Sequence, residues 1–220
     1  MKEGKKQMRF PNAYKGVSKL FLAEILMLIG AVVSIIAAVI LLAAYSADPN
    51  GLIEGAVATM GVSSIALLAA GVLAIIGFIL NLVGLVQAKK DDGGFKIALI
   101  FALICIALSI VSSILTTINP FISGWMEFVV TIFELAVFEY VVIGIMSLSN
   151  QLGDQRMVSF GSKVRMLISI LYIVLLIIRL FGNINVTFAG VVGIVGAILE
   201  LVVYIGYLIY LAKAKKMLAK

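Results

Sequence analysis

Long apolar runs separated by short polar segments dominate the chain. A helix needs about 20 mostly apolar residues to cross a hydrocarbon core of about 30 Å, and six runs reach that length. They cover residues 20–45, 61–86, 97–118, 121–147, 164–182 and 187–212. The pattern predicts an all-α, polytopic integral membrane protein with six transmembrane helices. Residues 20–212 then form the membrane domain, between a basic N-terminal segment, 1–19, and a basic tail, 213–220.

The composition supports this interpretation. Of the 220 residues, 63% are hydrophobic and 13% are charged, and the mean hydropathy is +1.22. Soluble domains are about 25% charged, because polar residues must cover their outer shell. A soluble enzyme and a disordered chain are therefore excluded. Nucleic-acid binding is not expected either, despite a pI near 9.4, because the basic residues lie at the ends of apolar runs.

The distribution of positive charge predicts the orientation in the membrane. All cations except Arg179 fall before the first run, after the last, between runs two and three, or between or at the inner ends of runs four and five. They are Lys2, Lys5, Lys6, Arg9, Lys15, Lys19, Lys89, Lys90, Lys96, Arg156, Lys163, Arg165, Lys213, Lys215, Lys216 and Lys220. Segments rich in Lys and Arg stay in the cytoplasm. We therefore expect a multi-pass protein of the cytoplasmic membrane with both termini inside.

The chain has one cysteine, Cys105, and no histidine. No intrachain disulfide or multi-cysteine metal site can form, and the usual imidazole base and metal ligand is missing. The sequence also has no Gly-rich phosphate loop of the Walker type. We therefore expect no catalytic constellation, no metal and no cofactor, which favours a protein that is not an enzyme.

Polar residues inside the apolar runs are the candidates for a functional site. They are Glu24, Asn81, Glu127, Glu134, Glu139, Arg179 and Glu200. A charge in mid-membrane costs about 2.5–3.5 kcal/mol on insertion scales, so such residues are functional candidates by default. The glutamates outnumber Arg179, which is the single cation away from the inner face. The surplus glutamates are then expected to be protonated, exposed to water, or paired with a cation from outside the chain.

The central layer of these residues lies in the last three spans. Glu134 and Glu200 fall near the middle of spans four and six, and we expect them to bind a cation or a proton. Tyr172 and Tyr204 lie at helical spacing along polar stripes of spans five and six, and we expect them to line the same cavity. A satisfied structural network is the alternative interpretation of these stripes.

Two further layers flank the centre. Glu127 and Arg179 lie near the outer ends of spans four and five, where they are predicted to form a bridge or an outer gate. Glu24, Asn81 and Glu139 lie closer to the cytoplasmic face and form a secondary inner layer. The spacing from Glu134 turns Glu139 to a different side of the helix, so either one span serves two environments or one of the two carboxylates faces the membrane interface.

These layers lead to two functional hypotheses. The first is a small transport or solute-binding membrane protein, linked through its glutamates to a proton, a small cation or a cationic solute. The second is a scaffold or assembly subunit that packs against a membrane partner through stripes of small residues. Such stripes are Gly30, Ser34 and Ala38 in span one, Ala66, Ala70 and Ala74 in span two, and Ala98, Ala102 and Cys105 in span three. Ordinary helix packing explains the same stripes.

A pseudo-repeat of three hairpins is a further interpretation. Glycines open the odd-numbered spans at Gly16, Gly94 and Gly161, and glycines lie near the ends of the even-numbered spans at Gly84, Gly144 and Gly206. Transporter folds often contain internal repeats, although apolar helices of low complexity also imitate one another.

No specific family is recognised. The segment from Ala66 to Ala70, extended to Ala74, resembles the AxxxA docking pattern of the substrate-binding membrane subunits of energy-coupling-factor importers. Six short spans with both termini inside resemble the layout of those subunits. The pattern lies here on the second span, whereas that family carries it on the first. The resemblance is therefore an analogy of layout.

Overall fold

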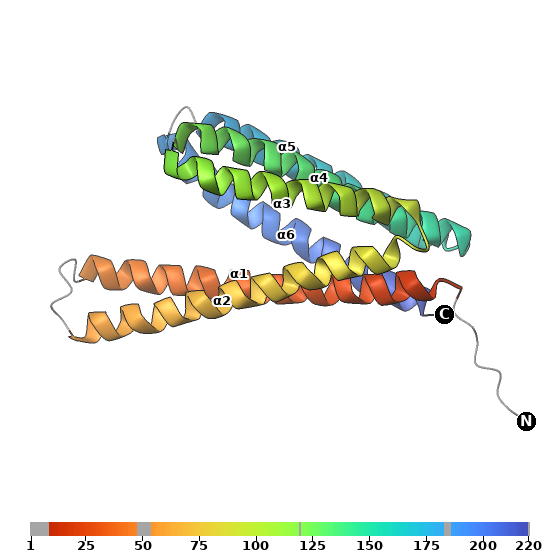
Figure 1. Cartoon of the computed structure of the whole chain (residues 1–220), viewed down its shortest axis with the longest axis horizontal. Helices are drawn as coiled ribbons and strands as arrows, with labels where there is room; N and C mark the ends of the chain where they lie inside the picture. The colour runs from red at the N-terminus through yellow and green to blue at the C-terminus, as the bar shows by residue number, and fades with distance from the viewer. Residues whose placement is uncertain (1–8, 48–53, 119, 183–185, 220) are drawn as a thin grey trace, which may run out of the picture. The chain divides into compact units, whose positions relative to one another are not determined.

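The computed structural model describes residues 9–47, 54–118, 120–182 and 186–219, and within these ranges it leaves the side chains at several helix ends undescribed. The described residues form six helices (Figure 1). They are α1 (Pro11–Ala47), α2 (Glu54–Ala88), α3 (Gly93–Ile118), α4 (Pro120–Gln151), α5 (Gln155–Gly182) and α6 (Val186–Leu218). Segments of α1 to α5 are long and apolar enough to cross a membrane. This confirms the expected all-helical, polytopic membrane protein, while much of the predicted span 187–212 lies outside the residues whose side chains are described.

The turn between α4 and α5 is fixed by local hydrogen bonds. Gly153 has a φ of +74°, a left-handed conformation that glycine adopts without a steric penalty. The Asp154 amide donates to the Ser149 carbonyl at 2.9 Å, which closes the end of α4. The Asp154 carboxylate then accepts from the Met157 amide at 3.0 Å and caps α5. The turn is therefore much shorter than the polar segment between the predicted spans, because both helices continue beyond the apolar core.

The start of α1 is capped by a residue from a distant loop. Asp91, between α2 and α3, accepts from the Ala13 amide at 2.7 Å and from the Asn12 side-chain amide at 2.9 Å. The next residue, Asp92, accepts from the Gly94 amide at 2.7 Å and caps α3. A helix N-terminus favours a carboxylate because its first amides lack partners within the helix. Two adjacent aspartates therefore stabilise the starts of two helices.

The chain divides into two compact units. One covers Lys19–Val83, and the other extends through Ser18 and continues from Gly84. In the first unit, α1 and α2 form an antiparallel pair whose facing positions are small and repeat every seven residues. This small-residue seam consists of Ala23, Gly30 and Ala37 of α1 and Gly77, Ala70 and Ser63 of α2, all buried. A seven-residue repeat keeps one seam between two helices along their length.

Contacts in the small-residue seam are close enough to involve the backbone. A Cβ atom placed on Gly30 would lie 3.1 Å from the Ala70 carbonyl oxygen, and one on Gly77 would lie 3.0 Å from that of Ala23. Lipid gives helices no hydrophobic reason to associate, so close backbone approach through small residues supplies the packing energy. The seven-residue spacing continues outside this unit, where a Cβ on Gly16 would lie 2.6 Å from the Gly84 carbonyl oxygen.

In the other unit, α3 packs on α4, α4 on α5, and α5 on α6. The α3–α4 contact is again closest at glycines, since a Cβ on Gly94 would lie 2.9 Å from the Gly144 Cα. Gly144 in turn lies against the Phe95 ring, which is fully buried. This packing fixes the start of α3 against the C-terminal part of α4.

Candidate functional site

Aromatic side chains from three helices meet at Phe138 of α4. The centroid of its ring lies 5.9 Å from that of Tyr172 on α5 and 5.0 Å from that of Tyr207 on α6, with interplanar angles of 47° and 83°. Tyr207 is buried, whereas Phe138 and Tyr172 are half-buried. Tilted and edge-on pairs of this kind are the favourable arrangements of aromatic rings. We call these three residues the aromatic cluster.

On the turn of α6 that follows Tyr207, the side chain of Tyr210 contacts both α4 and α5. Its side chain is fully buried, and its ring packs edge-on against Phe160 of α5 at 5.6 Å. Its hydroxyl donates to the Val142 carbonyl of α4 at 3.4 Å. A Cβ on Gly161 would lie 2.5 Å from the same hydroxyl oxygen, so only glycine leaves room for it. Tyr210 thus joins three helices and sets the position of the neighbouring aromatic cluster.

Glu134 lies one helical turn from Phe138, near the middle of α4, and its side chain is exposed on this chain. Four residues advance an α-helix by a little more than a full turn, so Glu134 and Phe138 share a face. The carboxylate also lies within electrostatic range of the Cys105 thiol on α3. That thiol contacts the Val130 carbonyl of α4 at 4.0 Å. Glu134 is therefore an exposed carboxylate one turn before Phe138 on α4 and near Cys105 of α3, while Phe138 itself contacts rings of α5 and α6.

The structure resolves the contacts of the predicted inner layer. Glu24 is 1% exposed and accepts from the Asn81 side-chain amide at 2.9 Å, within the α1–α2 pair. Glu139 forms an ion pair with Arg165 and accepts a hydrogen bond from the Ser169 hydroxyl, both on α5. The three residues therefore belong to two separate networks, one in each unit. Arg165 was expected to belong to the cytoplasmic charge, but it is the partner of Glu139, which lies within a predicted span.

Three predicted site residues lie outside the part of the chain with described side chains. These are Glu127, Arg179 and Glu200, so the bridge between Glu127 and Arg179 and the role of Glu200 stay predictions. Tyr204 is described as half-buried, one turn from Tyr207 on α6. Of the predicted central residues, Tyr172 contacts Phe138, which lies one turn from Glu134 on α4. Tyr204 lies on the turn of α6 before Tyr207.

Sequence reasoning did not select Phe138 or Tyr207 for the site. The sequence feature that could have identified Phe138 is its position four residues after Glu134, on the same face of the helix. Tyr207 could have been identified because it lies on the same polar stripe as Tyr204. The predicted small-residue stripes are only partly correct. Gly30 and Ala70 do pack together, but Ala38 and Ala74 are exposed, because the repeat in this hairpin has seven residues rather than four.

Comparison with known proteins gives no assignment for this arrangement. No family model matches the chain, and neither a curated protein nor a solved structure matches it. Within the described residues, no group of three or more Asp, Glu or Cys side chains is placed to hold a metal ion. The function is therefore argued from Glu134, the aromatic cluster and the position of both among apolar helices.

Proposed function

We propose that the protein is a small multi-pass transport or solute-binding protein of the cytoplasmic membrane, with six spans and both termini inside. Five segments long and apolar enough to cross a membrane support the membrane location. The concentration of Lys and Arg in alternate polar segments supports the orientation. A sixth crossing by α6 keeps the basic tail on the same side as the other cations.

The pseudo-repeat forms part of this proposal. Gly16 lies against Gly84 at the end of the α1–α2 pair, and Gly94 lies against Gly144 at the corresponding end of the α3–α4 pair. The equivalent contact of Gly161 is made with Tyr210. Two hairpins with matching glycine contacts support a common ancestral hairpin, and the third differs where it accommodates a tyrosine.

The observation that carries the functional proposal is the position of Glu134 one helical turn before Phe138, the ring that joins the aromatic cluster. A cation between a carboxylate and aromatic faces gains charge attraction and cation–π attraction, the latter about 0.5–2 kcal/mol per ring. A proton, a small metal cation and an organic cation all satisfy the carboxylate, whereas the rings favour an organic cation. The site sits where α4, α5 and α6 meet, so occupancy changes the packing of three helices at once.

The inner layer has a structural role in this proposal. Glu139 is neutralised by Arg165, and Glu24 is hydrogen-bonded to Asn81. We assign the coupling of binding to a proton or a cation to Glu134 and Glu200. Arg179 and Glu127 are assigned to an outer gate.

Uptake into proteoliposomes tests the proposal. The purified protein is reconstituted, and uptake of radiolabelled tetramethylammonium and of Na⁺ is measured under an imposed pH gradient. We expect wild-type uptake above that of empty liposomes and uptake at the background level for Glu134→Gln. The matched control is Glu139→Gln on the same helix, which changes the Arg165 pair and should retain most of the uptake. Unchanged uptake and pH dependence in both Glu134→Gln and Glu200→Gln would contradict the proposal.

A scaffold remains the alternative, and one observation favours it. Among the described residues, nothing lies within 4 Å of a Cβ placed on Gly61 or Gly71 of α2, so small residues also face outward. Ala70 packs inside the chain and cannot distinguish the two functions. The Gly71→Leu variant can distinguish the two functions, because its new side chain fills open space without disturbing the α1–α2 hairpin. Loss of function in Gly71→Leu together with tolerance of Glu134→Gln would favour the scaffold.

A further inference from the structure

An exposed stripe runs along α5 and another along α6, and each changes from basic to apolar. Members of each stripe are spaced by three, four or seven residues, which keeps them on one side of the helix. We call them the lateral stripes, and they consist of Arg156, Lys163, Leu167 and Ile170 on α5 and of Lys216, Lys213, Ile209, Ile205 and Val202 on α6, all exposed. Lysine and arginine keep their charged ends in water or among headgroups, whereas exposed apolar surface on a membrane-spanning helix meets hydrocarbon. Each lateral stripe therefore marks a boundary between headgroups and hydrocarbon.

A contact between α5 and α6 places the two boundaries at one level. The Lys213 Nζ lies 4.5 Å from the centroid of the Phe160 ring of α5, and Phe160 lies one turn before Lys163. At a rise of about 1.5 Å per residue, the stripe of α5 becomes apolar between about 5 and 10 Å beyond Phe160. The stripe of α6 becomes apolar within about 6 Å of Lys213, in the same direction, because the two helices run antiparallel. Two helices thus define the same boundary independently.

The basic ends of the lateral stripes have no acidic residue on their own helices to balance them. Neither α5 nor the chain from Leu201 onward contains Asp or Glu. The preceding acidic residue, Asp154, accepts from the Met157 amide as the cap of α5, and Glu139 of α4 pairs with Arg165. The cations of the lateral stripes therefore form a basic surface that adjoins an apolar one. A soluble acidic partner would meet the basic ends alone, whereas an anionic lipid covers both.

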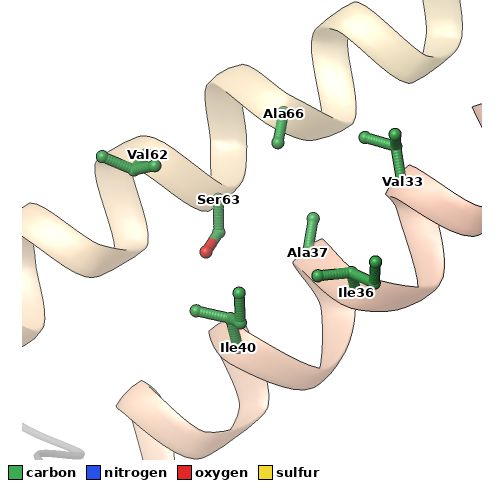
Figure 2. A pocket seen from close by; sticks show the side chains of 7 residues that line it. All are labelled: Val33, Ile36, Ala37, Ile40, Val62, Ser63 and Ala66. Atoms are coloured by element: carbon green, nitrogen blue, oxygen red, sulfur yellow. The ribbon is translucent and has the colours of Figure 1, made fainter.

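The groove between α1 and α2 lacks such a basic end. Its volume is about 370 Å³, and it is lined by seven side chains, of which Ser63 is the only polar one (Figure 2). No lining residue is charged, so this groove offers nothing that distinguishes one headgroup charge from another. Selection of a lipid by its charge is therefore expected at the lateral stripes and not in this groove.

We propose that the lateral stripes of α5 and α6 bind a phospholipid whose headgroup carries a net negative charge. Its phosphate lies between Lys163 and Lys213, which the Phe160 ring holds toward α5 by a cation–π contact. The exposed Ser159 hydroxyl, one turn before Lys163, is a further donor to the phosphate. The acyl chains lie along the apolar ends of the two stripes. This inference rests on the membrane crossing of α6 that the proposed function includes.

Native mass spectrometry of the whole protein in detergent tests the proposal with two probes of equal chain length, phosphatidylglycerol and phosphatidylcholine. A lysine near the headgroup favours an anionic lipid about fivefold, so the two lysines beside the phosphate should together give about thirtyfold. We expect the first phosphatidylglycerol to bind the wild type more tightly than the first phosphatidylcholine by at least this factor. Lys163→Gln combined with Lys213→Gln should reduce the preference about thirtyfold. Lys163→Arg combined with Lys213→Arg keeps both charges and should keep the preference.

Lys89→Gln combined with Lys96→Gln is the matched control, because it removes the same charge from exposed lysines after α2 and at the start of α3. It should keep the preference of the wild type. An equal affinity of the wild type for both lipids overturns the proposal, as does an equal loss of preference in the two glutamine variants. Displacement of the lipid by glycerophosphoglycerol, the headgroup without acyl chains, also overturns it and identifies a soluble anion as the occupant. Lipid binding is measured here without transport, so a wild type that takes up cations but shows no lipid preference contradicts this inference alone.

Discussion

The glycine contacts at the end of the α1–α2 pair give a quantitative prediction. A Cβ on Gly16 would lie 2.6 Å from the Gly84 carbonyl oxygen and 2.7 Å from the Ala88 amide nitrogen. Both contacts are with backbone, so no side-chain rotation relieves them and the two helices must move apart. Overpacking of this kind costs about 1–3 kcal/mol. The better helix propensity of alanine returns up to about 1 kcal/mol, so Gly16→Ala should lose about 1–2 kcal/mol of stability.

Thermal unfolding in detergent micelles, followed by circular dichroism, measures this loss. A domain of this size shifts its midpoint by about 2–4 °C per kcal/mol, so Gly16→Ala should unfold about 2–8 °C below the wild type. Gly71→Ala is the control in the same pair of helices, because nothing described lies within 4 Å of its new Cβ. It should be neutral or slightly stabilising. Equal destabilisation by Gly16→Ala and Gly71→Ala would refute the close packing of α1 on α2.

Three further predictions concern the inner layer and the single thiol. Asn81→Leu removes the donor to Glu24, which is 1% exposed, and should cost about 1–3 kcal/mol in thermal unfolding; an unchanged midpoint would contradict the buried contact. Arg165→Ala should cost less than about 1 kcal/mol in the same assay, because half of the Arg165 side chain is exposed and the pair is screened; a larger loss would show that the pair is more deeply buried. The half-buried Cys105 thiol should react with N-ethylmaleimide more slowly in the folded protein than in sodium dodecyl sulfate, and equal rates would contradict its contact with α4.

The helical architecture follows from the sequence because a membrane span has a simple requirement. Twenty apolar residues in a row satisfy it whatever surrounds them, and five of the predicted runs coincide with helices long and apolar enough to cross a membrane. The helix ends could not be located in this way. Asp91 caps α1 across a long sequence separation, and Gly153 with Asp154 shortens a polar segment to a tight turn.

The candidate site was harder to predict, because its members depend on packing between helices. Glu134 and Tyr172 could be selected because polar residues in apolar runs are conspicuous. Phe138 could not be selected from the sequence, because it is one of many apolar residues in its span. Only its packing against Tyr172 and Tyr207 identifies it as part of the site. Arg165 was counted with the cytoplasmic charge because it opens a span, and only the structure shows that it pairs with Glu139.

The proposed binding of a cation beside Glu134 is tested most directly by ligand-dependent thermal stability. Purified wild-type protein is heated with tetramethylammonium or Na⁺ at constant ionic strength. Binding to the folded state alone stabilises it by about 2.7 kcal/mol at one hundred times the dissociation constant, so the midpoint should rise with tetramethylammonium concentration. Glu134→Gln and Phe138→Leu should lose this rise, whereas Glu139→Gln should keep it. A rise of the same size in Glu134→Gln, or no response of the wild type to either cation, would contradict the account.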